Sequence, residues 1–261
     1  RRSTVELFVV CVAALLASGL TLFSGFGLGT LLMPVVALFF PLDLAIAMTA
    51  MVHLANNLFK IGLLGRKADY SVLLEFGLPA IMAAFAGAAL LTYLGEVKPI
   101  YEYQAFGNDR QVTVLKLIVG ALIISFVVLE LSPTFSKMAL DRQWLPLGGI
   151  ISGFFGGLSG HQGAFRSIFL IKAGLEKEAF VATGVVLAVM VDLSRMVIYG
   201  ADISAHGEAI EWRLVLGASI SAFTGAYVGA KMLKKVTLRS VQLVVSALLI
   251  VVGGGLIAGV L

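Results

Sequence analysis

The chain has too little charge to cover a surface that faces water. Only 13% of its 261 residues are Asp, Glu, Lys or Arg, whereas 59% are hydrophobic. A typical soluble domain carries about 25% charged residues. Apolar stretches close to the ~20 residues needed to cross a bilayer recur along the whole sequence. The composition therefore predicts a polytopic helical membrane protein and excludes a soluble domain.

Cysteine and catalytic motifs are also scarce. The single cysteine, Cys11, excludes an intramolecular disulfide framework. The sequence contains no P-loop, no HExxH metal motif and no GxSxG nucleophile elbow. We therefore expect neither an enzyme nor an ATP-driven pump, and no cofactor or metal. In a membrane protein the formal net charge of +4 reports basic cytoplasmic loops, so nucleic acid is not an expected partner.

The apolar segments predict helices. No strand is expected, because a transmembrane barrel would show short alternating segments instead of continuous apolar runs. The longest polar connection, Gly95–Gln111, predicts a solvated loop. The expected helices are Val5–Phe23, a short Thr30–Phe40, Leu44–Leu64, Val72–Leu94, Val112–Leu131, Leu145–Leu158, a short Phe165–Ala173, Ala179–Tyr199, Trp212–Met232 and Leu238–Leu261.

Two glycine-rich breaks, Ser24–Thr30 and Ser159–Arg166, interrupt the apolar sequence. Irregular backbone survives in a bilayer only inside protein or beside a water-filled cavity. The short helix after each break would offer free N–H groups and the positive end of its dipole, which together favour an anion. We therefore predict that both breaks line a substrate site. Their glycines are Gly25, Gly27, Gly29, Gly160 and Gly163.

Matching segments recur in the same order in the two halves of the chain. Chance apolar similarity explains any one match, but four in register indicate a duplicated unit. We therefore expect one integral membrane domain made of two repeats, residues 1–131 and 132–261. The matches pair Gly25 with Gly160, Ala45-x-x-x-Thr49 with Ala179-x-x-x-Thr183, Phe85–Ala88 with Phe223–Ala226, and Leu117–Leu122 with Leu243–Leu248.

The apolar segment after each break is too short to cross a bilayer at ~1.5 Å per residue. Two layouts remain, a re-entrant hairpin of half-helices or a single crossing by a broken helix. The hairpin gives an odd number of crossings per half and therefore inverted repeats. It also gathers most loop Lys and Arg residues on one side of the membrane, as the positive-inside rule favours, although Arg1 and Arg2 fall on the other. The inverted, re-entrant layout is preferred.

The second break adds polar side chains to its glycines. Arg166 is expected in the first turn of its short helix, where its planar fork suits an oxyanion such as carboxylate, sulfonate or sulfite. His161 and Gln162 are expected to complete the site as hydrogen-bond donors. The alternatives are that Arg166 snorkels to an interface or pairs with a buried acid, and that a neutral His161 bonds a carbonyl.

Two of the long apolar segments also carry polar residues. Thr49, Asn56, Asn57 and Thr183 are expected to line the substrate cavity. On the first of these segments, the i, i+3, i+4, i+7 spacing places His53, Asn56, Asn57 and Lys60 on one helical face.

The ionisable residues of these segments are candidates for ion coupling. Asp192 and Arg195 stand at i, i+3 and are expected to pair within one helix, which favours structural neutralisation. In the functional alternative, Asp192 or His53 carries a coupling proton. Lys60 lies near a helix end, where it can also snorkel to the interface.

Several of these motifs together resemble a known family. They are Ser24–Thr30 followed by Pro34, then Ala45-x-x-x-Thr49, and the repeated pattern from Gly153 to Thr183. Over nearly its whole length the sequence resembles the TauE/SafE sulfite exporter family, also called the toluene-sulfonate uptake permease family. The resemblance implies a secondary transporter of sulfur-containing anions, such as sulfite, sulfonates or thiosulfate, in a prokaryotic inner membrane.

The second break departs from the pattern of that family. Many members carry a run of glycines and then a proline, whereas this chain has His161 and Gln162 in the run and no proline in Phe165–Ala173. With Arg166, these residues are expected to distinguish the substrate.

The main interpretation is a secondary transporter that works by alternating access. A passive anion channel and a membrane docking or regulatory protein are the alternatives. The expected partners are a small sulfur oxyanion or organosulfonate and the lipid bilayer, and a homodimer is an assembly that the sequence allows.

Overall fold

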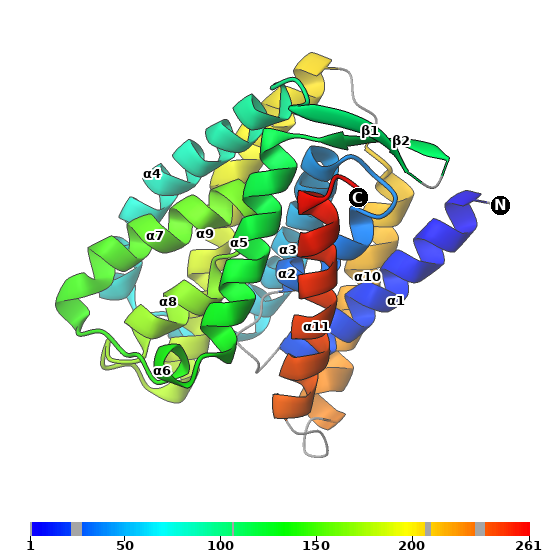
Figure 1. The fold of residues 1–261 in the computed structure, drawn as a ribbon. Helices are drawn as coiled ribbons and strands as arrows, with labels where there is room; N and C mark the ends of the chain where they lie inside the picture. Colours follow the sequence, from blue (N-terminus) through cyan, green and yellow to red (C-terminus); the bar gives the residue numbers. More distant parts are fainter. Residues whose placement is uncertain (1, 22–27, 106, 207–209, 233–237) are drawn as a thin grey trace.

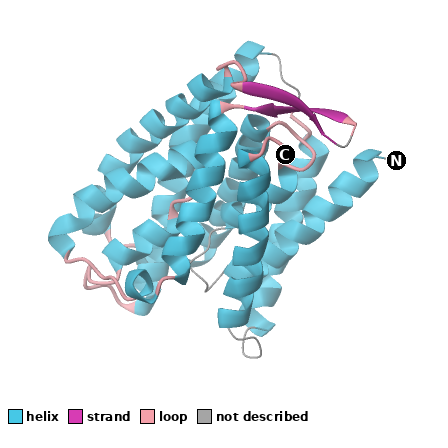
Figure 2. Cartoon of the chain, viewed as in Figure 1, coloured by secondary structure: helices cyan, strands magenta, loops and turns pink. Residues whose placement is uncertain are grey.

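The computed structural model describes residues 2–21, 28–105, 107–206, 210–232 and 238–261. Within these ranges the chain is a bundle of helices with a short β-hairpin at one end (Figures 1 and 2). This confirms the predicted all-α polytopic membrane bundle. Four of the described helices are long and apolar enough to cross a membrane, namely Leu42–Gly62, Tyr70–Gly95, Val114–Leu131 and Lys177–Asp202.

The main helices follow the predicted order, but some of their ends differ. The short helix of the second break begins at Gly163, before the predicted Phe165, and ends at Leu170. The helix that begins at Lys177, α9, continues beyond the predicted end at Tyr199 to His206. A helix that leaves the apolar layer can carry polar residues. The main helices are α1 (Arg2–Thr21), α2 (Leu28–Val36), α3 (Leu42–Leu64), α4 (Tyr70–Gly95), α5 (Val114–Leu131), α7 (Leu145–Ser159), α8 (Gly163–Leu170), α9 (Lys177–His206), α10 (Trp212–Met232) and α11 (Leu238–Ile257). Short turns η1 (Gly65–Lys67), α6 (Pro133–Ser136) and η2 (Arg142–Trp144) connect some of them.

The polar segment Gly95–Gln111 is more than a solvated loop. Within it, β1 (Tyr101–Ala105) pairs antiparallel with β2 (Asn108–Val112), and Gly107 makes the turn with a φ of 74°. The expectation of no strand was therefore wrong here. Tyr101 and Tyr103 alternate with Glu102 and Gln104 along β1, but β2 is polar on both faces, so only one strand carries an alternating pattern.

Helices α7 and α8 form a hairpin whose two open ends meet. The Leu140 N–H, just before α7, donates to the Ile168 carbonyl near the end of α8 at 3.1 Å. Asp141 and Lys172 lie side by side in an isolated β-bridge, and their side chains form an ion pair. α8 therefore returns to the level at which α7 begins, and the break between the two helices is buried at Ser159, His161 and Gln162.

A row of glycines lets α7 lie directly against α4. Gly149, Gly153 and Gly157 each face the carbonyl of one α4 residue, in the order Phe76, Ala80, Ala84. A Cβ at any of these glycines would collide with that carbonyl. Small residues at i, i+4, i+8 are how helices approach closely in membranes. The two helices run parallel, because the contact partners rise together along both chains.

The corresponding helices α3 and α9 lie against each other and run in opposite directions. Near the middle, His53 of α3 contacts Asp192 of α9. Lys67, just after α3 ends, pairs with Glu178 in the first turn of α9. The end of one helix therefore meets the beginning of the other.

Helices α5 and α11 repeat this antiparallel arrangement. Gly120 of α5 lies against Gly253 of α11, and Gln111, before α5, lies against Gly259, after α11. In both pairs, a helix from residues 1–131 lies against a helix from residues 132–261.

Candidate functional site

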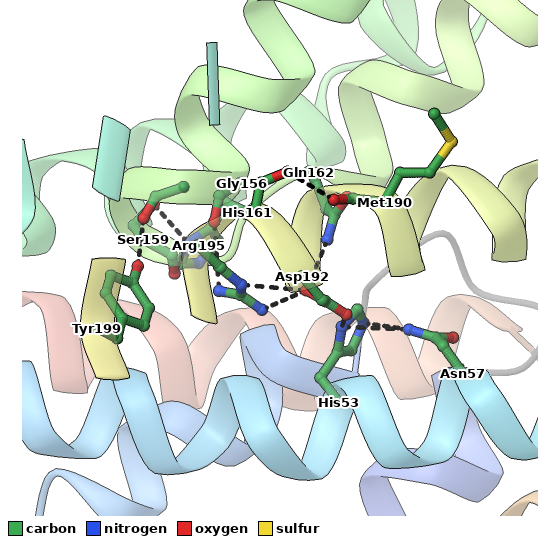
Figure 3. A network of polar contacts seen from close by, with 12 residues as sticks. His53, Asn57, Gly156, Ser159, His161, Gln162, Met190, Asp192, Arg195 and Tyr199 are labelled. Atoms are coloured by element: carbon green, nitrogen blue, oxygen red, sulfur yellow. Dashed lines mark hydrogen bonds and ion pairs between the residues drawn. The ribbon is translucent and has the colours of Figure 1, made fainter. Parts of the chain in front are cut away.

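Asp192 of α9 is the centre of a buried polar network (Figure 3). The residue is completely buried. Its Oδ2 lies 2.6 Å from Nδ1 of His53 on α3, and Nδ2 of Asn57 lies 3.3 Å from Nε2 of the same ring. Its Oδ1 accepts hydrogen bonds from Nε and Nη2 of Arg195, at 3.0 and 2.7 Å. The i, i+3 pair inferred from the sequence is therefore present, and His53 joins it from the neighbouring helix.

Arg195 ties α9 to the end of α7. Its Nη1 donates to the Gly156 carbonyl at 3.2 Å, and the Tyr199 hydroxyl donates to the Gly157 carbonyl. Gly160 follows with a φ of 81°, and a side chain there would reach within 3.1 Å of Nη1 of Arg195. A glycine is required at this position both for the left-handed backbone and for the close approach of the guanidinium.

Gln162 bridges Asp192 and Arg166. Its Nε2 donates to Oδ1 of Asp192, and its Oε1 accepts from Nη1 of Arg166, both at 3.3 Å. Its own carbonyl accepts from the hydroxyl of Ser152 on α7 at 2.9 Å. Arg166 is the fourth residue of α8 and so lies in the first turn of that helix. The second break thus joins the carboxylate of α9 to the cation of α8.

His161 is held in a defined orientation beside Gln162. Its Nδ1 lies 3.0 Å from the Ser159 carbonyl, and its ring stacks on Phe126 with centroids 5.0 Å apart. A carbonyl only accepts, so a neutral ring carries its hydrogen on Nδ1 and presents Nε2 as an acceptor. That Nε2 atom is buried and has no partner among the described residues. The expected donor role therefore requires a protonated ring.

The polar face of α3 meets the start of α2. Asn56 accepts from the Ser18 hydroxyl at 3.4 Å, but its Nδ2 and the Thr49 hydroxyl are buried and have no partner in the described part of the chain. A side chain at Gly29 would lie 3.8 Å from Cγ2 of Thr49 and 3.9 Å from Cδ2 of His53. The first helical turn after the first break therefore lies against the same α3 face as the network.

The cluster carries more positive than negative charge. Lys60 on α3 lies within electrostatic range of Arg166, and Arg166 lies within range of Asp192. Asp192 is already paired with Arg195. Within the described ranges, neither Lys60 nor Arg166 has a carboxylate partner. No group of three His, Cys, Asp or Glu residues in these ranges suits a metal ion. The uncompensated charge suits an anion.

The comparison with known families agrees with this chemistry. The family model described as "Sulfite exporter TauE/SafE" matches residues 10–256, which is nearly the whole chain. The chain belongs to this family. Comparison with the curated proteins gives no match.

TauE/SafE proteins are transporters and not enzymes, so the chain is a multi-pass membrane transporter of the class that moves sulfur anions such as sulfite. The buried network lies inside the region matched to the TauE/SafE family. Its position among apolar helices agrees with a role in transport, because ionisable groups in such places are costly and mark substrate or ion pathways.

Some of the predicted TauE/SafE site residues lie away from the network. Thr183 is buried, but its hydroxyl accepts from the backbone N–H of Asp69 at the start of α4, at 2.9 Å. Its neighbour Gly184 faces Nε of Arg166, 3.6 Å from where a Cβ would stand. Gly25 and Gly27 lie outside the described residues.

Sequence reasoning missed three polar residues of the network. Tyr199 stands one turn after Arg195, so an i, i+4 rule applied to Arg195 could have found it. Ser159 was visible at the edge of the break as a hydroxyl beside His161. Ser152 carried no signal, since its contact with Gln162 depends on how α7 and α8 fold together.

Proposed function

We propose that this TauE/SafE chain binds a small sulfur oxyanion or sulfonate between its two breaks and moves it by alternating access. The observation that carries the proposal is a pair of cations, Lys60 and Arg166, that have no carboxylate partner among the described residues. Both are half-buried, and a charge partly withdrawn from water without a partner is costly. A bound oxyanion would supply the missing negative charge and fill the planar fork of Arg166 with two hydrogen bonds.

Groups on both breaks would complete the anion site. Gly163 begins α8, whose free N–H groups and positive dipole end favour negative charge. Thr49 and Asn56 offer buried donors beside the start of α2. His161 offers an acceptor, which suits an anion that carries a hydrogen of its own, such as hydrogen sulfite.

The pseudo-symmetry of the packing supports alternating access between inverted repeats. If α1 to α5 correspond in order to α7 to α11, then α4 corresponds to α10 and α1 to α7. The contact of α4 with α7 should then have a matching contact of α10 with α1, and both contacts occur. The contact of α4 with α9 likewise becomes that of α10 with α3. Corresponding helices that face each other in opposite directions are expected when a two-fold axis lies in the membrane plane.

The test of the anion site is a pair of substitutions at Arg166. Thiosulfate binding to the purified chain is measured by calorimetry. We expect Arg166→Ala to weaken binding by about 1.5–3 kcal/mol, or roughly 10- to 150-fold, because charged hydrogen bonds are lost. Arg166→Lys keeps the charge and loses the fork, so it should fall between wild type and Arg166→Ala.

Arg142→Ala is the matched control. It removes one exposed guanidinium, which pairs with Glu75 at 2.8 Å on the surface and makes none of the hydrogen bonds described for the network. Binding should stay at the wild-type value. Unchanged binding in Arg166→Ala would show that the anion lies elsewhere.

A coupling proton at His53 or Asp192 is part of the proposal. The hydrogen-bonded pair lies in the protein interior, and its second helix, α9, also carries Arg195. Uphill accumulation of sulfite in proteoliposomes under an imposed proton gradient is the expected result. Flux that only follows the sulfite gradient would favour the passive channel.

We propose residence in a prokaryotic inner membrane on the basis of the family, and a homodimer as one assembly to test by its mass in detergent.

A further inference from the structure

We propose that the side chain of Gln162 couples the proton site at His53 and Asp192 to the anion site at Arg166. The inference rests on the proposed function, and it assigns Gln162 a positioning role rather than that of a substrate ligand. Gln162 is 3% exposed. It is the side chain that touches both Asp192 and Arg166.

The orientation of the Gln162 amide is fixed by its two neighbours. The carboxylate of Asp192 only accepts hydrogen bonds, so it must face the NH₂ group. The guanidinium of Arg166 only donates, so it must face the amide oxygen. A flipped amide would place oxygen against oxygen and donor against donor. The amide therefore holds Arg166 only while Asp192 holds the amide.

The backbone at Gln162 is fixed, so a response to charge is confined to the side chain. The Gln162 carbonyl accepts from Ser152 at 2.9 Å and from the Arg166 N–H at 3.1 Å. Its N–H donates to the Gly160 carbonyl at 3.1 Å. The side chain packs against Gly156, where a Cβ would stand 3.1 Å from Cβ of Gln162. The glycine thus makes the space in which the amide lies.

Protonation at the His53–Asp192 pair weakens the hold on the amide. Asp192 then no longer presents a full negative charge to Nε2 of Gln162, and Oε1 no longer stays fixed on Arg166. The guanidinium needs another acceptor, and the oxygen of a substrate anion supplies it. Proton binding and anion binding therefore favour each other, and by linkage the effect is reciprocal. Anion affinity is highest at low pH and falls as pH rises.

The other charged groups near Asp192 act in the same direction or stay constant. Arg195 remains bonded to Asp192 and to the α7 backbone, and Tyr199 to the α7 backbone alone. Lys60 of α3 lies within electrostatic range of Arg166. His161 faces Arg195. In the described part of the chain none of these groups hydrogen-bonds to both Asp192 and Arg166, as Gln162 does. Gln162 therefore transmits the change through hydrogen bonds, in addition to the direct electrostatic effect of Asp192 on Arg166.

The test measures how pH changes anion affinity in the full chain, in lipid nanodiscs. Thiosulfate is the probe, because its own charge stays the same between about pH 5 and about pH 8. By calorimetry, we expect the wild type to bind more tightly at the low end by roughly 5- to 150-fold, the usual range of coupling. Gln162→Met keeps the length of the side chain without polar atoms, so its ratio of affinities should fall clearly below the wild-type ratio.

Two further variants keep the test decisive. Gln162→Asn retains an amide that is too short to bridge, and it should lower the pH ratio like Gln162→Met. Ser194→Ala removes a buried hydroxyl that bonds only to its own helix, through the Met190 carbonyl, and should keep the wild-type ratio. If one Gln162 variant does not fold, the other provides the same readout.

Two results would overturn the coupling role of Gln162. They are a wild-type ratio near one, and a Gln162 variant that keeps the wild-type ratio. If such a variant also binds thiosulfate equally more weakly at both pH values, Gln162 is a direct ligand of the anion. By contrast, wild-type thiosulfate binding in Arg166→Ala would contradict the anion site itself, so failure of the proposed function is distinguishable from failure of the coupling.

Discussion

Asp192 stabilises the network as one carboxylate with three side-chain partners. It accepts from Arg195 and Gln162 through Oδ1 and contacts His53 through Oδ2. Burial of an ion pair is costly, and breaking one by removing a single partner leaves an uncompensated charge. The carboxylate therefore contributes stability that is separate from any proton that it carries in transport.

Removing Asp192 alone should destabilise the chain more than removing the pair. We expect Asp192→Leu to lower the free energy of unfolding by about 3–5 kcal/mol, since Arg195 stays buried without a counter-charge. The double variant Asp192→Leu with Arg195→Met should recover part of that loss. Denaturant unfolding in detergent micelles measures all three chains. A single variant that costs less than about 1 kcal/mol, the value of an exposed pair, would contradict this role.

At the scale of elements, the site depends on how closely α7 lies against α4. The contact carries no side chain from α7 at the three glycines that face α4 carbonyls. Without the hydrophobic effect between helices in lipid, such packing and the hydrogen bonds that it permits hold the helices together. The positions of Gly156 and Ser159 in the last turn of α7, and of Gln162 just before α8, follow from this contact.

A branched side chain in the glycine row should separate α4 from α7. Gly153→Val places atoms where the Ala80 carbonyl lies. We expect a lower yield of folded protein, and a loss of stability of about 1–3 kcal/mol from overpacking. Gly200→Ala is the control, because its added Cβ meets no atom within 4 Å. The control should be neutral or stabilising by roughly 0.5–1 kcal/mol. Equal behaviour of the two variants would argue against close packing at Gly153.

At the scale of the whole molecule, the two ends of the bundle differ. The hairpin β1–β2 lies at the end opposite α6 and the open end of the α7–α8 pair (Figure 1). Ion pairs join the segments at the α6 end, such as Arg142 with Glu75 and Lys67 with Glu178. By the positive-inside rule, we expect the α6 end, which carries Lys67 and Arg142, to face the cytoplasm and the hairpin to face outward.

Single cysteines test this orientation directly. In a Cys11→Ser background, Gln104→Cys on the hairpin and Lys172→Cys at the opposite end are exposed sites. A membrane-impermeant maleimide added to intact cells should label Gln104→Cys, and should label Lys172→Cys only after the cells are permeabilised. Labelling of both from the same side would contradict the inverted layout.

Much of the fold could be predicted from local patterns, and the site only in part. Apolar runs, the two glycine breaks and the first-turn position of Arg166 are properties of short segments. The Asp192–Arg195 pair needed only helical spacing. The hairpin β1–β2 was missed, because β1 has only a short alternation of Tyr with Glu and Gln and β2 is polar on both faces.

The sequence by itself determined that the chain crosses a membrane as helices, that its apolar order is broken twice, and that ionisable residues are buried where they are costly. These properties follow from composition and spacing within single segments. Only the tertiary structure decided that His53 reaches Asp192, 139 residues away, and that Gln162 lies between Asp192 and Arg166. The physical reason is that these contacts need α3 and α9 to pack antiparallel and α7 to reach α4 through its glycines, and spacing along one segment does not specify either arrangement.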